Sequence, residues 1–499
     1  MIIAGNLKRS FLSLFFLMSL TLVRAQFVTI PDTNLVAYFQ SLVPAAMSGN
    51  QLDTANVVVN TTIISINCNT RNISNLYGIQ FFSSLKYLNC QNNSATSIPP
   101  LPATTQTLIC TGNSLSTLPA LPAQLKRLEC AATGLTALPN LPSGLTYLDC
   151  SYDSLTTFPS TMPPGLDWLN CSYNLLTALP NLSGALTHLE CNNNQISNIP
   201  GFGVALTFLD CSNNLLTSLP ALPGGLLTFH CSFNNLTALP TLPNTITWMQ
   251  CGGCPNLTTL PALPASLITL ECPYNQFTSL PAFPNSIKYL NIYYTYALTT
   301  YPAWPTSLLY VDCSAGYNIT SLPPFPNMLQ HLDCSFSSHL KNLPALPNSL
   351  NYLNTGFDSI YCFPAFPANI YTLAIMPNNV VTCLPNYLPA MDPATLALPL
   401  CQIGNPNGCP AAVGINEPAA IKNFISVFPN PSADFIAIGG EKIEDPEMAV
   451  VQIYNNLGEI VRTQKFCKML SISDLAVGSY MLQITTSRGE IRRSRFIKE

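Results

Sequence analysis

The segment Leu219–Ala238, LPALPGGLLTFHCSFNNLTA, is one copy of a unit that recurs through most of this 499-residue chain. The copies align on one ladder position, usually a cysteine, that returns about every 20 or 21 residues. Sixteen residues share this phase: Cys68, Cys90, Cys110, Cys130, Cys150, Cys171, Cys191, Cys211, Cys231, Cys251, Cys272, Ile292, Cys313, Cys334, Thr355 and Ile375. Such a period predicts a solenoid in which each coil stacks on its neighbours.

Apolar and polar residues alternate around the ladder cysteine, which predicts a short strand. In Leu128-Glu129-Cys130, we expect Leu128 and Cys130 to point into the core and Glu129 to point outward. The asparagine three residues after the cysteine, as in Asn174, is expected to hydrogen-bond backbone groups of the turn. The Leu-Pro-x-Leu-Pro segment predicts an extended, polyproline-like return side, because proline fixes φ and lacks an N–H.

The unit matches the leucine-rich repeat pattern, with cysteine in its third apolar slot. Residues 60–400 resemble the cysteine-containing leucine-rich repeats of secreted proteins from Bacteroidetes-type bacteria. The expected fold is an α/β-type leucine-rich repeat solenoid of about 16 coils over residues 62–400, followed by a small all-β sandwich. We expect an N-terminal cap over residues 26–61, with a helix-like segment at Asn34–Leu42, and a C-terminal cap from Met376 to about Cys409.

The N-terminus has the features of a secretory signal peptide. A basic pair, Lys8 and Arg9, precedes the largely apolar run Phe11–Val23, and a small-x-small sequence ending at Ala25 resembles a cleavage site. The apolar run is shorter than the roughly 20 residues that span a bilayer. Residues 1–25 are therefore predicted to be a signal peptide, with a membrane anchor as the alternative, and the exported chain is not expected to span a membrane.

Composition excludes several classes of protein. Charged residues make up 8% of the chain, against roughly 25% in an ordinary soluble protein. Hydrophobic residues make up 48%, which argues against intrinsic disorder. With 19 Lys and Arg against 23 Asp and Glu, the chain is not a polybasic nucleic-acid binder.

The composition changes near residue 411, which indicates a domain boundary. From Lys422 onward there are 10 basic and 9 acidic residues, whereas residues 60–400 contain only 6 and 11. We expect the end of the cap and a linker over residues 401–423, and a separate β-sandwich over residues 424–499. Its predicted strands are Val450–Tyr454, Glu459–Arg462, Tyr480–Thr485 and Glu490–Ile497.

Three blocks of the tail resemble the type A C-terminal sorting domain of the type IX secretion system. They are Val427–Pro431, Val451–Gly458 and Gly478–Tyr480, and the basic segment Arg492–Lys498 follows them. The corresponding sorting-motif residues are Pro429, Asn430, Pro431, Gly458, Gly478 and Tyr480. The resemblance implies recognition by the type IX machinery and release from, or attachment to, the outer cell surface. A plain adhesive sandwich is the alternative.

Outward strand positions predict two columns on the concave face. The aromatic column lies three residues before the ladder position: Tyr87, Tyr147, Trp168, His188, Phe208, Trp248, Tyr289, Tyr310, His331 and Tyr352. The acidic column lies one residue before it and contains Glu129, Asp149, Glu190, Asp210, Glu271, Asp312 and Asp333. Aromatic rings offer rigid contact area, and the carboxylates could bind sugar hydroxyls, basic peptide segments or cations. The expected partner is an unknown protein or glycan.

The same columns fit a purely structural interpretation, because outward aromatic residues cover a pleated sheet well. Carboxylates on neighbouring coils would repel each other, which points weakly to a bound cation or a basic partner. We expect neither a cofactor nor a metal site. The sequence therefore leaves two functions open, a binding module and a rigid spacer for display.

Thirteen of the 19 cysteines occupy the ladder position, and we expect free thiols stacked in the core as small apolar side chains. Cys362 and Cys383 share one phase of adjacent coils, and Cys401 and Cys409 close a short loop. Disulfides Cys362–Cys383 and Cys401–Cys409 are therefore predicted in the C-terminal cap. The CGGC sequence of Cys251–Cys254 is interpreted as a ladder cysteine plus a cysteine at the asparagine position.

The sequence contains no phosphate-binding loop, nucleophile elbow or zinc-protease motif. His188 and His230 lie two coils apart, roughly 10 Å, which is too far to share one metal. Leu-Pro repeats also look like those of bacterial effectors with a C-terminal ubiquitin-ligase domain. That domain needs a long helical segment with a nucleophilic cysteine, whereas the short tail is β-like and Cys467 has no partner histidine there. We expect no enzyme activity.

Overall fold

The computed structural model describes residues 26–375, 381–388, 391, 393–402, 425–428, 432–440, 443, 446–455, 459–488 and 491–499. The chain forms two compact units, Met1–Val413 and Gly414–Glu499. The predicted signal peptide, most of the predicted linker and five singled-out residues lie outside the described residues: Cys409, Pro429, Asn430, Pro431 and Gly458. None of the helices in the described part is long and apolar enough to cross a membrane.

A small cap begins the first unit. Its strands form an antiparallel sheet in the order β1-β3-β2. A ten-residue helix, α1, lies beside them, and short helical turns follow. The elements are β1 (Phe27–Thr29), α1 (Thr33–Leu42), η1 (Pro44–Ala46), β2 (Met47–Ser48), β3 (Gln51–Asp53), η2 (Val58–Thr62) and η3 (Ile79–Phe81).

Asp32 begins helix α1 and ties the cap to the repeats. One carboxylate oxygen accepts hydrogen bonds from the backbone N–H groups of Asn34 and Leu35, as an N-cap residue does. The other oxygen accepts hydrogen bonds from the N–H and hydroxyl of Ser74 at 2.7 and 2.8 Å. The helix buries Phe39 completely, so the cap covers the first coils of the core.

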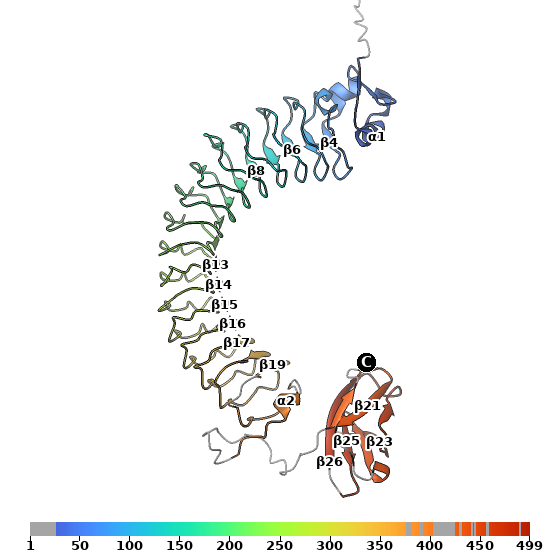
Figure 1. Cartoon of the computed structure of the whole chain (residues 1–499), viewed down its shortest axis with the longest axis vertical. Coiled ribbons are helices and arrows are strands. Elements are labelled where there is room, and N and C mark those ends of the chain that lie inside the picture. Colours follow the sequence, from blue (N-terminus) through green and yellow to red (C-terminus); the bar gives the residue numbers. More distant parts are fainter. Residues whose placement is uncertain are drawn as a thin grey trace, which may run out of the picture. The chain divides into compact units, whose positions relative to one another are not determined.

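The repeats form one parallel sheet of 16 strands in sequence order, β4 to β19, on the concave side of the solenoid (Figure 1). This confirms the predicted number of coils. Each strand is only three residues long and pairs in register with the next coil, so equal repeat positions lie side by side. The strands are β4 (Ser65–Asn67), β5 (Tyr87–Asn89), β6 (Thr107–Ile109), β7 (Arg127–Glu129), β8 (Tyr147–Asp149), β9 (Trp168–Asn170), β10 (His188–Glu190), β11 (Phe208–Asp210), β12 (Thr228–His230), β13 (Trp248–Gln250), β14 (Thr269–Glu271), β15 (Tyr289–Asn291), β16 (Tyr310–Asp312), β17 (His331–Asp333), β18 (Tyr352–Asn354) and β19 (Thr372–Ala374).

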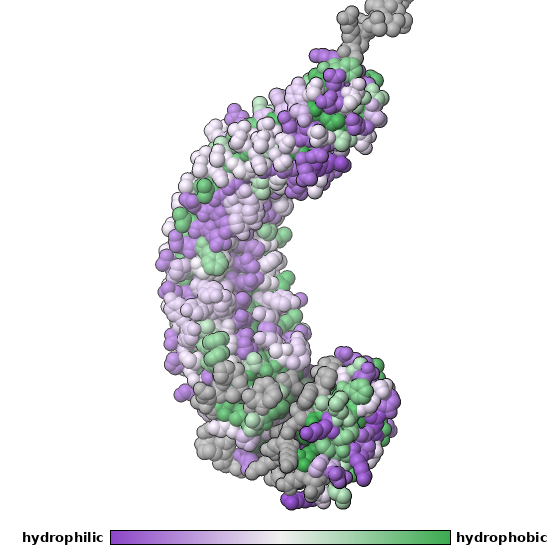
Figure 2. All heavy atoms as spheres, turned by 45° about the vertical axis from the view of Figure 1, so that its right-hand side comes forward, coloured by the Kyte–Doolittle hydropathy of each residue, from purple (hydrophilic) through white to green (hydrophobic). Residues whose placement is uncertain are grey.

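The core runs continuously through the coils. Leu128 and Cys130 are both fully buried, as predicted, and Glu129 is partly exposed. The strand itself is Arg127–Glu129, one residue earlier than expected, and Cys130 lies just past its end. The proline-rich return segments contain no regular helix in the described coils, in agreement with the polyproline-like expectation. Pale residues of intermediate hydropathy cover much of the solenoid face in Figure 2.

Asparagine side chains link successive coils, as predicted. Asn214 Nδ2 donates to the carbonyl oxygens of Cys191, Cys211 and Ser212 at 3.0, 3.1 and 3.2 Å. Its Oδ1 accepts a hydrogen bond from the Ile196 N–H at 2.9 Å. One buried side chain thus satisfies backbone groups of two coils, which would otherwise be costly to bury.

The ladder cysteines are buried free thiols, as expected. Burial raises the pKa of these thiols well above its ordinary value at most positions, for example at Cys130 and Cys231. Cys251 and Cys254 are also free and buried. Cys254 stands at the asparagine position, where its N–H donates to Asn275 Oδ1 at 2.9 Å. The CGGC segment is therefore part of the ladder.

Both predicted disulfides are wrong. Cys383 is bonded to Cys401, with 4.9 Å between their Cα atoms. This pairing excludes Cys362–Cys383 and Cys401–Cys409. Cys362 is also disulfide-bonded and packs beside the Cys383–Cys401 pair.

The chain of the C-terminal cap changes direction after the last regular coil, which explains why the two disulfide predictions were wrong. The short helix α2 (Pro393–Leu396) precedes a parallel bridge between Leu384 and Leu400. The Cys401 N–H donates to the Leu384 carbonyl at 2.8 Å, so Cys401 lies directly beside Cys383. The spacing of the repeats could not predict that the chain turns back and places Cys401 beside Cys383.

The second unit contains two antiparallel sheets, ordered β20-β21-β24 and β23-β22-β25-β26. The strands are β20 (Ile425–Phe428), β21 (Phe435–Gly440), β22 (Val450–Tyr454), β23 (Ile460–Lys465), β24 (Met469–Ser471), β25 (Gly478–Thr485) and β26 (Ile491–Lys498), with a helical turn η4 (Pro446–Met448). All four predicted strands occur within a few residues of their expected bounds. Strands β20, β21 and β24 were not predicted individually.

Candidate functional site

The concave face presents both predicted columns, because the first and third residues of each strand point outward while the middle residue is buried. The aromatic column occupies the first strand position and the acidic column the third. In-register pairing places His188 beside Trp168 and Phe208, and Glu190 beside Asp210. The structure therefore brings the predicted residues into two rows along the sheet, and the aromatic row is interrupted at Thr107, Arg127, Thr228 and Thr269.

Four rings of the aromatic column form a stack that Arg127, at the same strand position of β7, extends to five side chains. The Arg127 guanidinium lies 3.6 Å above the centre of the Tyr147 ring. The Tyr147 and Trp168 rings are 5.6 Å apart, Trp168 and His188 are 3.3 Å apart, and His188 and Phe208 are 4.1 Å apart, all nearly parallel. Each ring is held on both sides, so the row is rigid before any partner arrives.

Thr228 interrupts this stack, and His230, the third residue of the same strand, continues it. The His230 ring meets Phe208 edge-on at 5.8 Å and Trp248 at 4.9 Å. Burial lowers the pKa of His230, although Asp210 and Glu271 oppose that effect. Its Nε2 atom is buried without a hydrogen-bond partner among the described residues. His230 is therefore a neutral, packed side chain that continues the row to Trp248.

A second stack covers the later coils. Tyr289 and Tyr310 lie 6.5 Å apart, Tyr310 and His331 lie 4.1 Å apart, and His331 and Tyr352 lie 3.8 Å apart. Burial lowers the pKa of His331, while the nearby Asp333 raises it to a smaller extent. Thr269 of β14 separates this stack from Trp248. The aromatic column is thus divided into two platforms.

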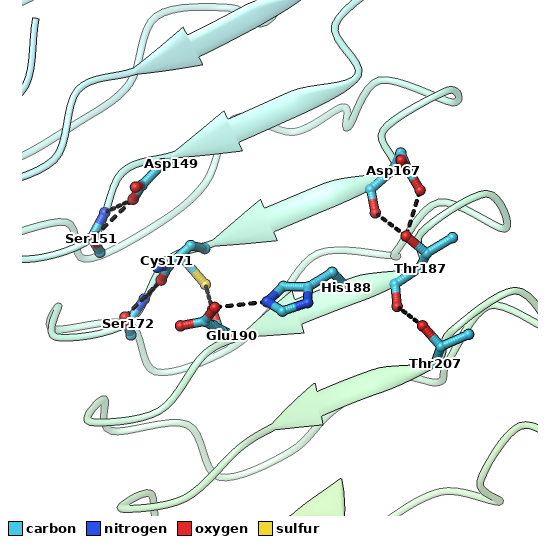
Figure 3. A network of polar contacts seen from close by, with 10 residues as sticks. Asp149, Ser151, Asp167, Cys171, Ser172, Thr187, His188, Glu190 and Thr207 are labelled. Atoms are coloured by element: carbon cyan, nitrogen blue, oxygen red, sulfur yellow. Dashed lines mark hydrogen bonds and ion pairs between the residues drawn. The ribbon is translucent and has the colours of Figure 1, made fainter. Parts of the chain in front are cut away.

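Two glutamates of the acidic column pair with the aromatic column on their own strand. Glu129 Oε1 lies 2.5 Å from Arg127 Nε. Glu190 Oε1 lies 2.7 Å from His188 Nε2, and Figure 3 shows this contact across strand β10. These pairs hold Arg127 and His188 in their stacked positions.

The aspartates of the acidic column are tied to the turn that follows each strand. Asp149 Oδ1 accepts hydrogen bonds from the Ser151 N–H at 3.1 Å and hydroxyl at 2.8 Å (Figure 3). Burial raises the pKa of Asp149, and these hydrogen bonds lower it in part. The same turn contact recurs at Asp210 with Ser212, Asp312 with Ser314 and Asp333 with Ser335.

Glu271 connects the two columns on neighbouring strands. Its Oε1 accepts hydrogen bonds from Trp248 Nε1 and Gln250 Nε2, each at 3.1 Å. Local partners of this kind explain how the column tolerates several carboxylates. Among the described residues, no group of three or more His, Cys, Asp or Glu is placed to hold a metal ion.

Sequence reasoning missed a third set of rings. An exposed aromatic residue stands two positions after the ladder residue in seven coils: Tyr152, Tyr173, Phe233, Tyr274, Tyr294, Phe336 and Phe357. The signal was present in the sequence as an aromatic residue at one fixed offset from the ladder. It was overlooked because only strand positions were compared between coils.

Two sorting-motif residues lie in the described part of the tail. Gly478 begins β25. Tyr480 is buried, its ring lies 5.5 Å from Phe496 of β26, and its hydroxyl donates to the Ala476 carbonyl at 2.8 Å. Tyr480 thus holds the loop before β25 against the sheet.

Family models match two parts of the chain. Residues 426–499 match the secretion system C-terminal sorting domain. Residues 185–224 match two copies of leucine-rich repeats. No curated protein matches the chain.

Several solved structures are similar to the solenoid. YopM from Yersinia enterocolitica has 28% sequence identity and a TM-score of 0.57, with 63% of this chain and 73% of that chain covered. YopM from Yersinia pestis, described as a leucine-rich effector protein, has 30% identity and a TM-score of 0.53, with 61% and 86% covered. The functional domain of InlJ from Listeria monocytogenes, which includes a cysteine ladder, has 17% identity and a TM-score of 0.49, with 96% and 100% covered.

Proposed function

This chain is a leucine-rich repeat protein that carries the C-terminal sorting domain of the type IX secretion system, and from that premise we propose that its concave face binds a partner outside the cell. The sorting domain indicates a secreted or cell-surface protein. The partner is a protein or a glycan, and the role is adhesion or interaction with other cells. The proposal contains no catalytic step.

The observation that carries the proposal is the prestacked aromatic column. Ordering side chains normally reduces binding affinity, because each immobilised side chain loses conformational freedom. Here Trp168 and His188 are already fixed between their neighbours. Trp248 and Tyr289 remain 42% and 48% exposed, so they provide contact area at the point where the two platforms meet.

The acidic column supports a partner that donates hydrogen bonds. Each turn-bound aspartate uses Oδ1 for the following serine. This contact fixes the orientation of the carboxylate, so that Oδ2 can accept a hydrogen bond from a hydroxyl or a basic group of the partner. Carboxylates flanking rigid rings suit basic peptide segments and sugar hydroxyls alike.

A rigid display spacer is the second candidate, and one observation favours it. The rings stack on each other, and Glu129, Glu190 and Glu271 all have partners within the solenoid. A surface that binds no ligand would also need partners within the solenoid for its polar side chains. The two functions differ in whether loss of the rings affects anything besides stability.

The test compares the full chain with a triple variant, Trp168→Ser, Phe208→Ser and Trp248→Ser. Both proteins are presented to a glycan array and to a surface-protein extract from neighbouring cells, after thermal melts have established that both are folded. We expect a defined ligand to bind the native chain and to be lost by the variant. A matched control replaces Tyr173, Phe233 and Tyr274 with asparagine, outside the concave face, and should keep this ligand. Equal binding by the triple variant of every ligand that the control also keeps, or no ligand at all, would favour the spacer.

A further inference from the structure

The turn after each strand contains a backbone conformation that suits glycine and asparagine. In 15 consecutive coils, the residue two positions after the ladder residue has φ between 52° and 68°. Asn193 and Asn213 occupy this position in two central coils and Gly253 in another. These are the residue types that adopt left-handed backbone most readily.

Seven coils have an aromatic residue at this position instead, and we call them the flank row: Tyr152, Tyr173, Phe233, Tyr274, Tyr294, Phe336 and Phe357. Their exposed fractions lie between 39% and 59%. A left-handed residue with a bulky side chain costs about 1 kcal/mol or more. Burial offsets only part of this cost, because about half of each side chain faces solvent. The flank row is therefore unfavourable for the folded chain alone, which points to a use outside the fold.

The flank row is one continuous feature of the solenoid. Backbone hydrogen bonds join it from coil to coil, for example from the Tyr152 N–H to the Ser172 carbonyl at 3.0 Å. The Tyr152 and Tyr173 rings stack at 4.2 Å, and the Phe336 and Phe357 rings stack at 4.6 Å.

Gly253 makes room for one of these rings. A Cβ atom on Gly253 would lie 2.5 Å from the Phe233 ring, so Phe233 leans across the next coil. The absence of a side chain at Gly253 thus allows the ring to lie along the row rather than away from it.

Except at the third position after the ladder residue, the turn positions next to the flank row carry no charged side chain of their own. Between residues 151 and 359, the positions one, two and four residues after the ladder residue contain no Asp, Glu, Lys or Arg. They are occupied largely by Ser, Asn, Gln and Tyr, which offer hydroxyl and amide groups. The two acidic residues at the third position of these turns are Asp153, which is partly buried, and Asp358, which is buried. A nucleic acid would find no complementary positive charge here, and a basic protein surface would find only carboxylates that already hydrogen-bond within the turns.

The length of the row identifies the form of the ligand. Residues 152 to 357 belong to 11 successive coils, which extend over roughly 50 Å at the spacing of paired strands. A small molecule would use only a fraction of such a row. An extended polymer would contact several rings at once, and binding through several weak contacts raises the overall affinity.

We propose that the flank row binds a neutral polysaccharide, whose sugar rings place their C–H faces against the aromatic side chains and their hydroxyls against the neighbouring Ser, Asn and Gln. This site is separate from the concave face, which is acidic and internally paired.

The test uses a variant whose replacement residues are the ones that other coils carry at the same repeat position. Tyr173→Asn, Phe233→Asn and Tyr274→Asn place asparagine where Asn193 and Asn213 already occur. The substitutions relieve backbone strain, so the variant should melt no lower than the native chain. The full chain, this variant and the concave Ser triple variant are run in native gels containing hydroxyethyl cellulose, galactomannan, dextran or starch, with heparin as the anionic probe.

We expect at least one neutral polysaccharide to retard the native chain and the concave variant, and the flank variant to lose at least fivefold in affinity. Heparin should retard none of them. The proposal fails if no neutral polysaccharide retards the native chain, or if the flank variant is retarded equally. Retardation that disappears only in the concave variant would overturn the flank site while supporting the proposed function of the concave face.

Discussion

The central coils and the last coils of the solenoid meet the same backbone requirement with different side chains. From Asn174 to Asn234, every coil places an asparagine three residues after the ladder residue. In the later coils this position is taken by Thr295, Gly316 and Ser337, and finally by Asp358. Asn214 both donates to carbonyl oxygens and accepts from an N–H. Where an asparagine stands at this position, it provides a donor and an acceptor on one short side chain.

An ionised aspartate at this position can accept hydrogen bonds but cannot donate one. Asp358 Oδ1 accepts a hydrogen bond from the Ser337 N–H at 2.6 Å, and Oδ2 lies 4.0 Å from the Cys334 sulfur. At the earlier substituted coil, Asp153 Oδ1 accepts from the N–H groups of Thr133, Gly134 and Leu135, and its buried Oδ2 has no hydrogen-bond partner in the part of the chain that the structure describes.

The comparison teaches that the repeat fixes the backbone, while side chains at this position decide how strongly neighbouring coils are joined. Where the amide is replaced by an acid, the missing donor can be restored by a proton. Burial raises the pKa of Asp153 above its ordinary value, and burial together with Asp333 raises the pKa of Asp358 to about 8, against the opposing Ser337 hydrogen bond.

Asn214→Ala should have the largest effect, because it leaves the buried Ile196 N–H without its partner and removes one of the two donors to the carbonyl oxygens of Cys191 and Cys211. We expect a loss of about 3–5 kcal/mol in local stability. Hydrogen exchange should accelerate at Ile196 and at the backbone amides of the two coils that Asn214 joins. Asn235→Ala removes an exposed amide one position after the next asparagine of the ladder and should change little. Equal effects of both substitutions would contradict a role for the ladder.

Removal of the Cys383–Cys401 disulfide by serine substitution should have the next largest effect. The bond closes a loop with a sequence separation of 18, and cross-links of that size stabilise by about 3 kcal/mol. Because coils contact only their neighbours, protease cleavage should begin at the C-terminal end of the solenoid while the central coils stay protected. Cys467→Ser, which removes an exposed free thiol in the tail, is the control. Uniform destabilisation of every coil would refute this local role.

Asp358→Asn should have a smaller effect that depends on pH. The pKa of Asp358 in the folded chain lies above its value in the unfolded chain, so the stability that it contributes is full below about pH 4 and is lost as the pH rises through about 8. The asparagine variant lacks this titration. Its advantage over the native chain should therefore grow between pH 5 and pH 8, by about 1 kcal/mol for each pH unit until the pH approaches the pKa.

Melting temperatures across this pH range provide the measurement for Asp358. The exposed Asp167, replaced by asparagine, should give no such pH dependence. A constant difference between native chain and Asp358→Asn variant at all pH values would show that Asp358 does not titrate in the folded chain as inferred.

Much of the concave face could be predicted from the sequence, because strand residues alternate and equal phases lie in register. The predicted rings and carboxylates do form two rows. Their partners could not be predicted. Whether Trp168 stacks on His188, or whether Glu271 accepts from Trp248 on the next strand, depends on side-chain directions across coils.

The sequence by itself determined the number of coils, the buried ladder, the extended convex side and the sorting domain, because each follows from a short pattern repeated at fixed spacing. Tertiary structure alone decided the Cys383–Cys401 pairing, since the cap leaves the repeat and its chain direction has no period to follow. It also decided which aromatic residues face solvent. Ring exposure depends on φ at the turn and on the neighbouring coil, as at Phe233 beside Gly253. Neither can be predicted from the sequence of a single repeat.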